Sequence, residues 1–124
     1  LCDGICRAHG AACTLEYTHA FAPTVNRAQC VPVAVRAAQE VVGPDRVDAD
    51  TPPMMISEDF GRFLQHVPGA FVFIGNGVGD EAGGVPLHNP RYDFNDRILP
   101  VGARWFAEVV RQRLPRAAAP SPAG

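Results

Sequence analysis

The sequence contains no lysine, so arginine supplies all of its positively charged side chains. This absence excludes catalysis through a lysine Schiff base and phosphate binding through a phosphate-loop lysine. Charged residues make up only 19% of the chain and the net charge is -2. A nucleic-acid partner would need a basic face, and no apolar run approaches the roughly 20 residues of a membrane span. We therefore expect neither nucleic acid nor membrane as a partner.

The sequence starts at Leu1, not at a methionine, within what reads as the middle of a helix. We therefore expect the 124 residues to be a fragment. Residues 1–10 lack the basic start and apolar run of a secretory signal. The four cysteines match no paired zinc motif. Small, mostly buried thiols in a reduced cytoplasm are the favoured interpretation, and a disulfide framework is the alternative.

Apolar residues at three- and four-residue steps predict helices at 1–9, 28–42 and 100–114. Ser57 is expected to cap a further short helix, with Glu58 and Asp59 in its first turn. Pro32 falls within the second helix, where a proline removes a backbone donor and clashes with the preceding turn. That helix therefore either begins near Pro32 or is kinked there.

Two segments have strand patterns of different kinds. Residues 11–21 alternate between apolar and polar side chains, as in a strand with one solvated face. Residues 70–74 form a continuous apolar run, as in a strand buried on both faces. The mixture of helices and strands predicts an α/β fold class, and the two kinds of strand indicate pieces of two sheets, hence of two domains.

His88 is the sharpest candidate for chemistry, because it lies in a loop soon after the apolar run at 70–74. Open α/β sheets place ligand sites in such loops, and neutral imidazole is a common ligand for zinc, manganese or cobalt. A metal site needs three or four ligands, however. On this residue alone, a histidine satisfied by hydrogen bonds within its loop is the simpler interpretation.

Other polar residues are weaker candidates. Glu58 and Asp59 are placed to orient a ligand, but complementarity to the helix dipole is the favoured interpretation from the sequence alone. Asn76, between two glycines, lies where backbone donors approach a carboxylate or oxyanion, although a plain flexible loop is the competing interpretation. Asn89, followed by a proline, stiffens the chain beside His88.

Four motifs, in this order and spacing, resemble one family: Glu16-Tyr17 through Pro23-Thr24-Val25-Asn26, Pro53-Met54-Met55-Ile56-Ser57-Glu58-Asp59-Phe60, Val67 through Gly77, and Leu87-His88-Asn89-Pro90-Arg91-Tyr92-Asp93-Phe94-Asn95-Asp96. They are similar to the C-terminal third of the metal-dependent N-acyl-amino-acid amidohydrolases. These enzymes are of the hippurate hydrolase and indole-acetyl-amino-acid hydrolase type, and they are relatives of the zinc carboxypeptidases. The resemblance covers nearly the whole chain up to Leu114.

The resemblance implies the C-terminal part of a two-domain metallo-amidohydrolase. A three-layer α/β catalytic domain carries the metal site, and an inserted α+β lid domain mediates dimerisation. On this basis residues 1–25 are the end of the lid, residues 26–116 are the C-terminal part of the catalytic domain, and residues 117–124 are a disordered tail. A cytoplasmic homodimer is the implied state of the whole protein.

The resemblance also implies the site. His88 matches the family's final metal ligand and would hold one of two divalent ions. Manganese, zinc, cobalt and nickel are the candidate metals. The remaining ligands and the general base are expected upstream of Leu1, so no catalytic residue is expected in this chain. Glu58, Asp59, Asn76 and Asn89 are substrate-side or supporting candidates. The implied substrate is a small N-acyl amino acid, hydrolysed by a metal-activated water, and the isolated chain is expected to be inactive.

Two alternatives stay open. The chain could be a non-catalytic piece that acts only in dimerisation or strand pairing through residues 11–21. A related desuccinylase or aminopeptidase would share the mechanism but not the substrate. The sequence also departs from the family pattern, with Arg27 in place of an aspartate, Ile56 in place of a glycine, and Pro32 inside an expected helix.

Overall fold

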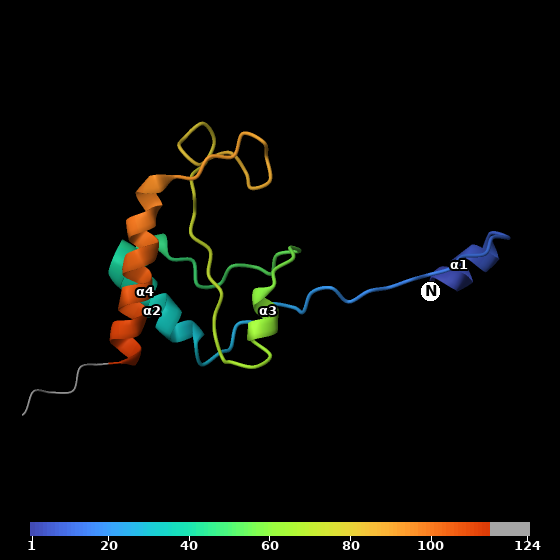
Figure 1. The fold of residues 1–124 in the computed structure, drawn as a ribbon, viewed down its shortest axis with the longest axis horizontal. Coiled ribbons are helices and arrows are strands. Elements are labelled where there is room, and N and C mark those ends of the chain that lie inside the picture. The colour runs from blue at the N-terminus through green and yellow to red at the C-terminus, as the bar shows by residue number, and fades with distance from the viewer. Residues whose placement is uncertain (115–124) are drawn as a thin grey trace, which may run out of the picture.

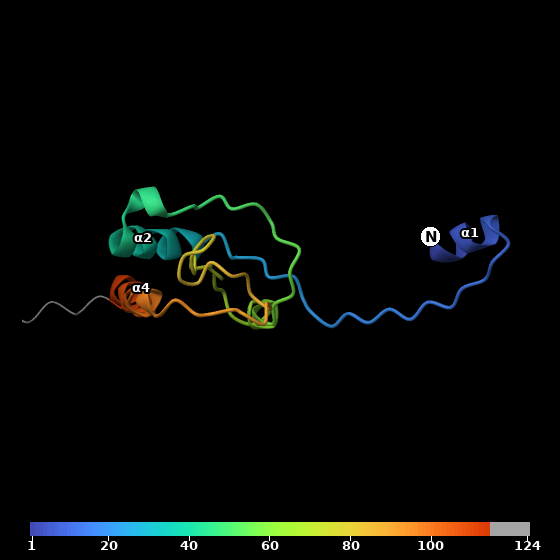
Figure 2. The same cartoon turned by 90° about the horizontal axis from the view of Figure 1, so that it is seen from above.

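The computed structural model describes residues 1–114. Its elements are α1 (Cys2–Ala8), α2 (Val31–Val42), the 3-10 helix η1 (Pro44–Arg46), α3 (Phe60–Phe63), the 3-10 helix η2 (Asp96–Ile98) and α4 (Leu99–Arg113). Helices α2 and α4 pack against each other, whereas α1 lies apart at the end of a long extended segment (Figure 1, Figure 2). No helix in the described part of the chain has the length and apolar character needed to cross a membrane. The tail predicted at 117–124 lies outside the described residues.

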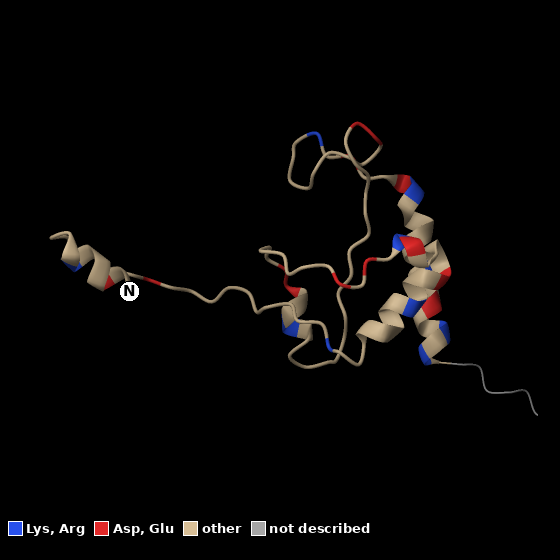
Figure 3. Ribbon diagram, turned by 180° about the vertical axis from the view of Figure 1, so that it is seen from behind, with Lys and Arg blue, Asp and Glu red and all other residues tan. Residues whose placement is uncertain are grey.

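The prediction of the two long helices is confirmed. Helix α4 begins and ends within one residue of the range expected from the sequence, and its charged positions are three arginines and one glutamate (Figure 3). Helix α2 begins at Val31 and has Pro32 in its first turn. A proline in that position costs no helical hydrogen bond, because the first N–H groups of a helix have no partner within it. Pro32 therefore starts the helix and does not kink it.

The start of α3 differs from the prediction that Ser57 caps it. The helix begins at Phe60, and Asp59 is its N-cap residue. The carboxylate of Glu58 accepts the backbone N–H groups of Asp59 and Phe60 at 3.0 and 3.3 Å. A carboxylate satisfies orphan donors and complements the positive end of a helix. Glu58 therefore performs the role that the sequence pattern assigns to serine.

The two predicted strands are absent from the described residues, so the α/β class is not observed there. Residues 11–21 run as an extended segment toward α1 (Figure 1), and all of them are exposed. Residues 70–74 also form no backbone hydrogen-bond ladder with a neighbouring strand, and Phe73 is 58% exposed. A strand needs neighbouring strands to take up its backbone donors and acceptors. These patterns are those of strands, but the described chain supplies no partners for them.

The buried apolar core is small and comprises Ala34, Ala37 and Leu64, which are 7%, 0% and 4% exposed. The two alanines lie on α2, and the indole N–H of Trp105 on α4 donates to the Ala34 carbonyl at 3.0 Å. Short side chains allow close approach of two helices. On α4, Phe106 is 66% exposed, so the apolar stripe predicted for this helix is only partly covered.

The cysteines are less buried than predicted. All four are free thiols; Cys6 and Cys30 are half-buried, and Cys2 and Cys13 are exposed. The thiol of Cys13 hydrogen-bonds to that of Cys6, which raises the pKa of Cys13. Three of these residues lie on or just after α1, which packs against no other element of the described chain. Their exposure follows from that isolation.

One asparagine joins the segment before α2 to the apolar run at 70–74. The side-chain amide of Asn26 donates to the Phe71 carbonyl at 2.9 Å and accepts the Phe71 N–H at 2.7 Å. The neighbouring Arg27 donates its backbone N–H to the Gly69 carbonyl at 3.0 Å and its guanidinium to the Leu64 carbonyl at 3.0 Å. The side chain of Asn26 thus imitates the paired bonds of a β-bridge.

Helix α3 holds the segment just before Asn26. The guanidinium of Arg62 donates to the Ala20 carbonyl at 2.8 Å. Gly61 is buried, and a Cβ atom placed on it would lie 2.5 Å from the Ala22 carbonyl oxygen and 2.8 Å from that of Pro23. These contacts fix the point at which the extended segment leaves the helical body.

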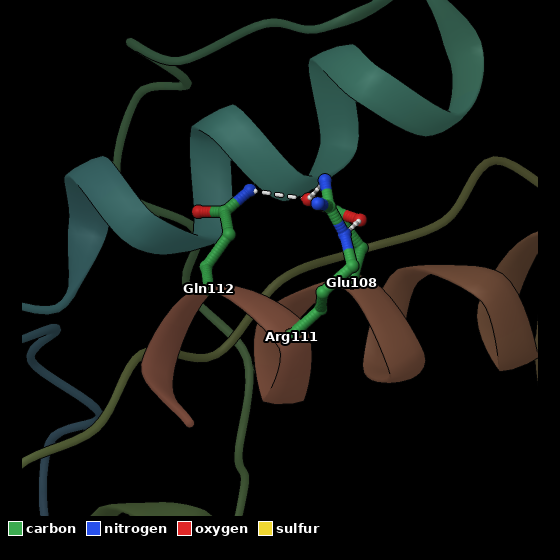
Figure 4. Close-up of polar contacts among 3 residues, drawn as sticks. All are labelled: Glu108, Arg111 and Gln112. Atoms are coloured by element: carbon green, nitrogen blue, oxygen red, sulfur yellow. Dashed lines mark hydrogen bonds and ion pairs between the residues drawn. The ribbon is translucent and has the colours of Figure 1, made fainter. Parts of the chain in front are cut away.

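A polar cluster on α4 faces α2 (Figure 4). The carboxylate of Glu108 accepts two bonds from Arg111, at 2.7 and 2.8 Å, and one from the Gln112 amide at 2.9 Å. The side chain of Glu108 is only 12% exposed, whereas that of Arg111 is 72% exposed. The pKa of Glu108 is lowered, chiefly by the hydrogen bonds from Arg111 and then by that from Gln112.

We expect Glu108→Gln to remove part of the acid sensitivity of the protein. A carboxyl group with a lowered folded-state pKa stabilises the fold above its unfolded pKa, and this contribution is lost as pH falls through the folded value. A glutamate has an ordinary pKa of 4.5. The wild type should therefore be the more stable protein near neutral pH, and the difference should vanish in acid below the lowered pKa. Denaturant midpoints of both proteins across this range measure it, and a difference independent of pH would contradict the expectation.

Candidate metal-ligand loop

The loop between the apolar run and η2, residues 75–95, is organised around Asn76. The side-chain amide of Asn76 donates to the carbonyls of Gly83 and Asp93 at 2.8 and 3.0 Å. Its side-chain oxygen accepts the backbone N–H of Asn95 at 2.9 Å, and its backbone carbonyl accepts the Asn95 side chain at 3.0 Å. Residues far apart along the loop are thus joined at one side chain.

Glycines allow the parts of this loop to approach closely. A Cβ atom on Gly83 would collide with the backbone oxygen and the side-chain amide of Asn76, and one on Gly77 would collide with the Ala82 carbonyl. Both glycines have positive φ angles, 77° at Gly83 and 150° at Gly77. Glycine adopts such angles at no steric cost. The glycine-rich sequence therefore folds as a closely packed turn around Asn76.

His88 lies within this loop, and its side chain is exposed. It is the one non-glycine residue among those described with a positive φ, 67°. The left-handed conformation costs an ordinary residue about 1 kcal/mol, and residues held in it cluster at functional sites. No hydrogen bond within the described chain uses the imidazole, so the interpretation of His88 as a histidine satisfied by its own loop is not supported.

Asn89 fixes the chain immediately after His88. Its side-chain oxygen accepts the backbone N–H of Arg91 at 2.9 Å, and its backbone carbonyl accepts that of Tyr92 at 2.9 Å. Its own N–H donates to the Pro86 carbonyl at 3.3 Å. An asparagine that bonds the backbone two residues on forms an Asx turn. Asn89 therefore acts on the backbone beside His88.

The acidic candidates Glu58 and Asp59 are not joined to this loop. The carboxylate of Glu58 is used at the start of α3, and Asp59 is exposed. No hydrogen bond or ion pair within residues 1–114 connects either side chain to His88. The carboxylate of Glu58 is therefore committed to backbone N–H groups at the start of α3.

The described residues do not make a complete metal site. No group of three or more histidine, cysteine, aspartate or glutamate side chains among them is arranged to hold a metal ion. A zinc site takes three or four protein ligands, and the family-like motif of this chain brings one of them, the exposed imidazole of His88. An imidazole can fill one position of a metal site, so a site built on His88 would need its other ligands from outside the described residues.

Sequence reasoning missed the role of Asn95. Its side-chain oxygen accepts the backbone N–H of Arg97 at 3.2 Å and so caps η2, while its amide bonds Asn76. Its position just before a short helical segment is the one signal that an N-cap search would have found. The bonds to Asn76, 19 residues away, leave no signature in a local pattern.

Comparisons with known proteins identify the family. Residues 4–112 match peptidase family M20/M25/M40. The chain belongs to this family. Peptidase M20/M25/M40 proteins similar to it include the hippurate hydrolase of Campylobacter jejuni, 29% identical over 92% of this chain and 28% of that protein. The IAA-amino acid hydrolase ILR1-like 5 of Arabidopsis thaliana is 30% identical over 80% of this chain and 22% of that protein.

A further peptidase M20/M25/M40 relative is thermostable carboxypeptidase 1 of Saccharolobus solfataricus, 28% identical over 82% of this chain and 25% of that protein. The chain therefore spans about a quarter of the length of the curated relatives that it matches. No solved structure gives a significant match. The resemblance to amidohydrolases that the sequence motifs indicate is confirmed.

Proposed function

We propose that this chain is the C-terminal part of a metal-dependent amide hydrolase that cleaves N-acyl amino acids, and that it supplies one metal ligand, His88. The observation that carries the proposal is the exposed imidazole of His88, held at a positive φ of 67° in a tightly bonded loop. A divalent ion bound there would polarise the amide carbonyl and activate water. The role of this chain is to present the imidazole in a fixed place.

The substrate class is taken from the relatives. Their printed names include a hippurate hydrolase and an IAA-amino acid hydrolase, both of which act on an acyl group joined to an amino acid. We extend this class to the whole protein, with two divalent ions completed by residues outside the chain. Glu58 and Asp59 are left as structural residues of α3, since no hydrogen bond or ion pair within residues 1–114 joins either side chain to the loop that carries His88.

The exposed apolar side chains support the two-domain architecture. Val72, Phe73 and Ile74 are 38%, 58% and 43% exposed, although their pattern is that of a strand buried on both faces. We propose that strands of the remaining protein cover residues 70–74 in a three-layer α/β catalytic domain spanning residues 26–116. Residues 1–25 would belong to the inserted lid, through which the protein dimerises.

A second candidate function rests on residues 11–21. This segment is exposed along its length, with Leu15 65% and Tyr17 75% exposed. Unpaired extended backbone recruits another strand. On this alternative the chain acts in strand pairing or dimerisation without catalysis of its own. The two candidate functions are compatible if residues 11–21 complete a sheet of the lid domain in the whole protein.

Metal removal tests the first candidate. We expect the full-length protein that contains this chain to hydrolyse N-benzoylglycine or another N-acyl amino acid, to lose turnover on dialysis against a chelator, and to regain it with Mn²⁺. The isolated chain should show no turnover, because it offers one metal ligand. Full turnover by the chelated protein would contradict metal dependence, and turnover of peptides with a free amino terminus in place of acylated amino acids would favour an aminopeptidase.

A further inference from the structure

Asn76 has few hydrogen-bonding positions left for a substrate. An asparagine side chain has two N–H donors and one oxygen with two lone pairs. Both donors are used, toward Gly83 and Asp93, and the oxygen accepts the Asn95 N–H. The side chain is therefore committed to the protein backbone, which argues against the substrate-side role considered from the sequence.

The backbone groups bonded by Asn76 bracket His88. Gly83 lies before His88 and Asp93 after it, and both carbonyls accept from one nitrogen atom, Nδ2 of Asn76. Asn95 adds a reciprocal pair of bonds on the far side. The segment that carries His88 is thus closed at its base by a single side chain.

The closure is reinforced by steric contact. The Cβ position of Gly83 coincides with space already occupied by Asn76, and Nδ2 of Asn76 would lie 2.5 Å from it. Within the segment, the Asx turn at Asn89 and the Pro86–Asn89 backbone bond restrict the chain on either side of His88. The backbone on either side of His88 is therefore held to the base of the loop.

We propose that Asn76 is a positioning residue that fixes the base of the His88 loop and so sets where the imidazole points. The inference rests on the proposed function of His88 as a metal ligand. Groups that orient a ligand by hydrogen bonding change metal affinity or activity by about 10- to 100-fold when they are removed. Here the orienting bonds act on the backbone of the loop.

Asn76→Asp in the full-length protein tests the proposal. Aspartate keeps the size and the acceptor for the Asn95 N–H, but it has no donors and faces the Gly83 and Asp93 carbonyls with a negative charge. We expect backbone amides at 83–95 to exchange with deuterium at least about tenfold faster than in the wild type. Asn26→Asp is the matched control, because Asn26 also bonds backbone groups through its amide, but those of Phe71. It should leave exchange at 83–95 unchanged.

A second, milder variant keeps the proposal testable if Asn76→Asp fails to fold. Asn95→Ala removes only the bond from the Asn95 side chain to the Asn76 carbonyl and the cap on η2, and it keeps the Asn95 N–H. It should accelerate exchange at 83–95 by a smaller factor. Wild-type exchange rates at 83–95 in both variants would overturn the role of Asn76.

Metal affinity and kinetics separate the inference from the function on which it rests. A positioning role predicts weaker Mn²⁺ binding by about 10- to 100-fold in Asn76→Asp, with KM little changed once metal is saturating. A substrate-contacting role predicts a raised KM with unchanged exchange, and that result would overturn the proposal. Faster exchange at 83–95 in a protein that binds no Mn²⁺ would uphold the loop closure and refute the proposed function alone.

Discussion

The full-length protein with His88→Ala should lose bound divalent metal and hydrolyse N-acyl amino acids on the order of 10³-fold more slowly. Metal support of the transition state is worth several kcal/mol, and each 1.36 kcal/mol is a factor of ten in rate. The substitution removes an exposed imidazole that no described residue bonds, so the fold should tolerate it. Metal content by mass spectrometry and kcat/KM together measure the effect.

His66→Ala is the matched control for His88→Ala. His66 is also exposed and lies just after α3, away from the 75–95 loop in sequence. It should change neither metal content nor kcat/KM. If His88→Ala keeps its full metal content and its full turnover, then His88 is not a ligand. A loss of activity with unchanged metal content would give His88 a role toward substrate instead.

Gly61→Ala should destabilise the protein by about 3 kcal/mol, the upper part of the range for overpacking a filled site. The added methyl group would lie 2.5 and 2.8 Å from two backbone carbonyl oxygens, those of Ala22 and Pro23. Backbone atoms cannot swing aside as a flexible side chain can. Relief therefore requires α3 and the 20–23 segment to separate, which also breaks the Arg62–Ala20 bond. Chemical denaturation followed by circular dichroism measures the loss.

Gly102→Ala is the control for Gly61→Ala. Gly102 lies inside α4, and a Cβ there would meet only the Ile74 side chain, at an ordinary 3.5 Å. Alanine in a helix interior is more stable than glycine by roughly 0.5–1 kcal/mol. The control should therefore be neutral or stabilising. Equal effects at both positions would show that the close approach at Gly61 is not a packing constraint.

Local sequence signals were sufficient to predict the positions of the two long helices. Helix α4 follows from its apolar stripe and the proline near its start, and α2 from its periodicity once Pro32 is placed in the first turn. Caps and prolines act within a few residues, so a single sequence contains what decides them. The exception is α3, where the N-cap residue is Asp59 and the carboxylate of Glu58, not the hydroxyl of Ser57, accepts the N–H groups of Asp59 and Phe60.

The pairing of strands with distant partners could not be predicted from the sequence. Alternation at 11–21 and the apolar run at 70–74 indicate strands, but a ladder forms only with partner strands, and the described chain supplies none. The candidate site likewise has one residue that the sequence predicts and one whose role it does not. His88 stands out by its motif, whereas the commitment of Asn76 to Gly83, Asp93 and Asn95 depends on a folded loop that no local rule specifies.

The contacts around residues 20–26 also determine how force passes between α1 and the helical body. A pull on the extended segment first meets the Arg62–Ala20 bond, then the close packing of Gly61, and last the two bonds between Asn26 and Phe71. These attachments are in series along the chain, so load reaches Asn26 only after the first two have yielded. Rotation of the N-terminal segment should therefore pivot before Ala20 and leave the loop that carries His88 undisturbed.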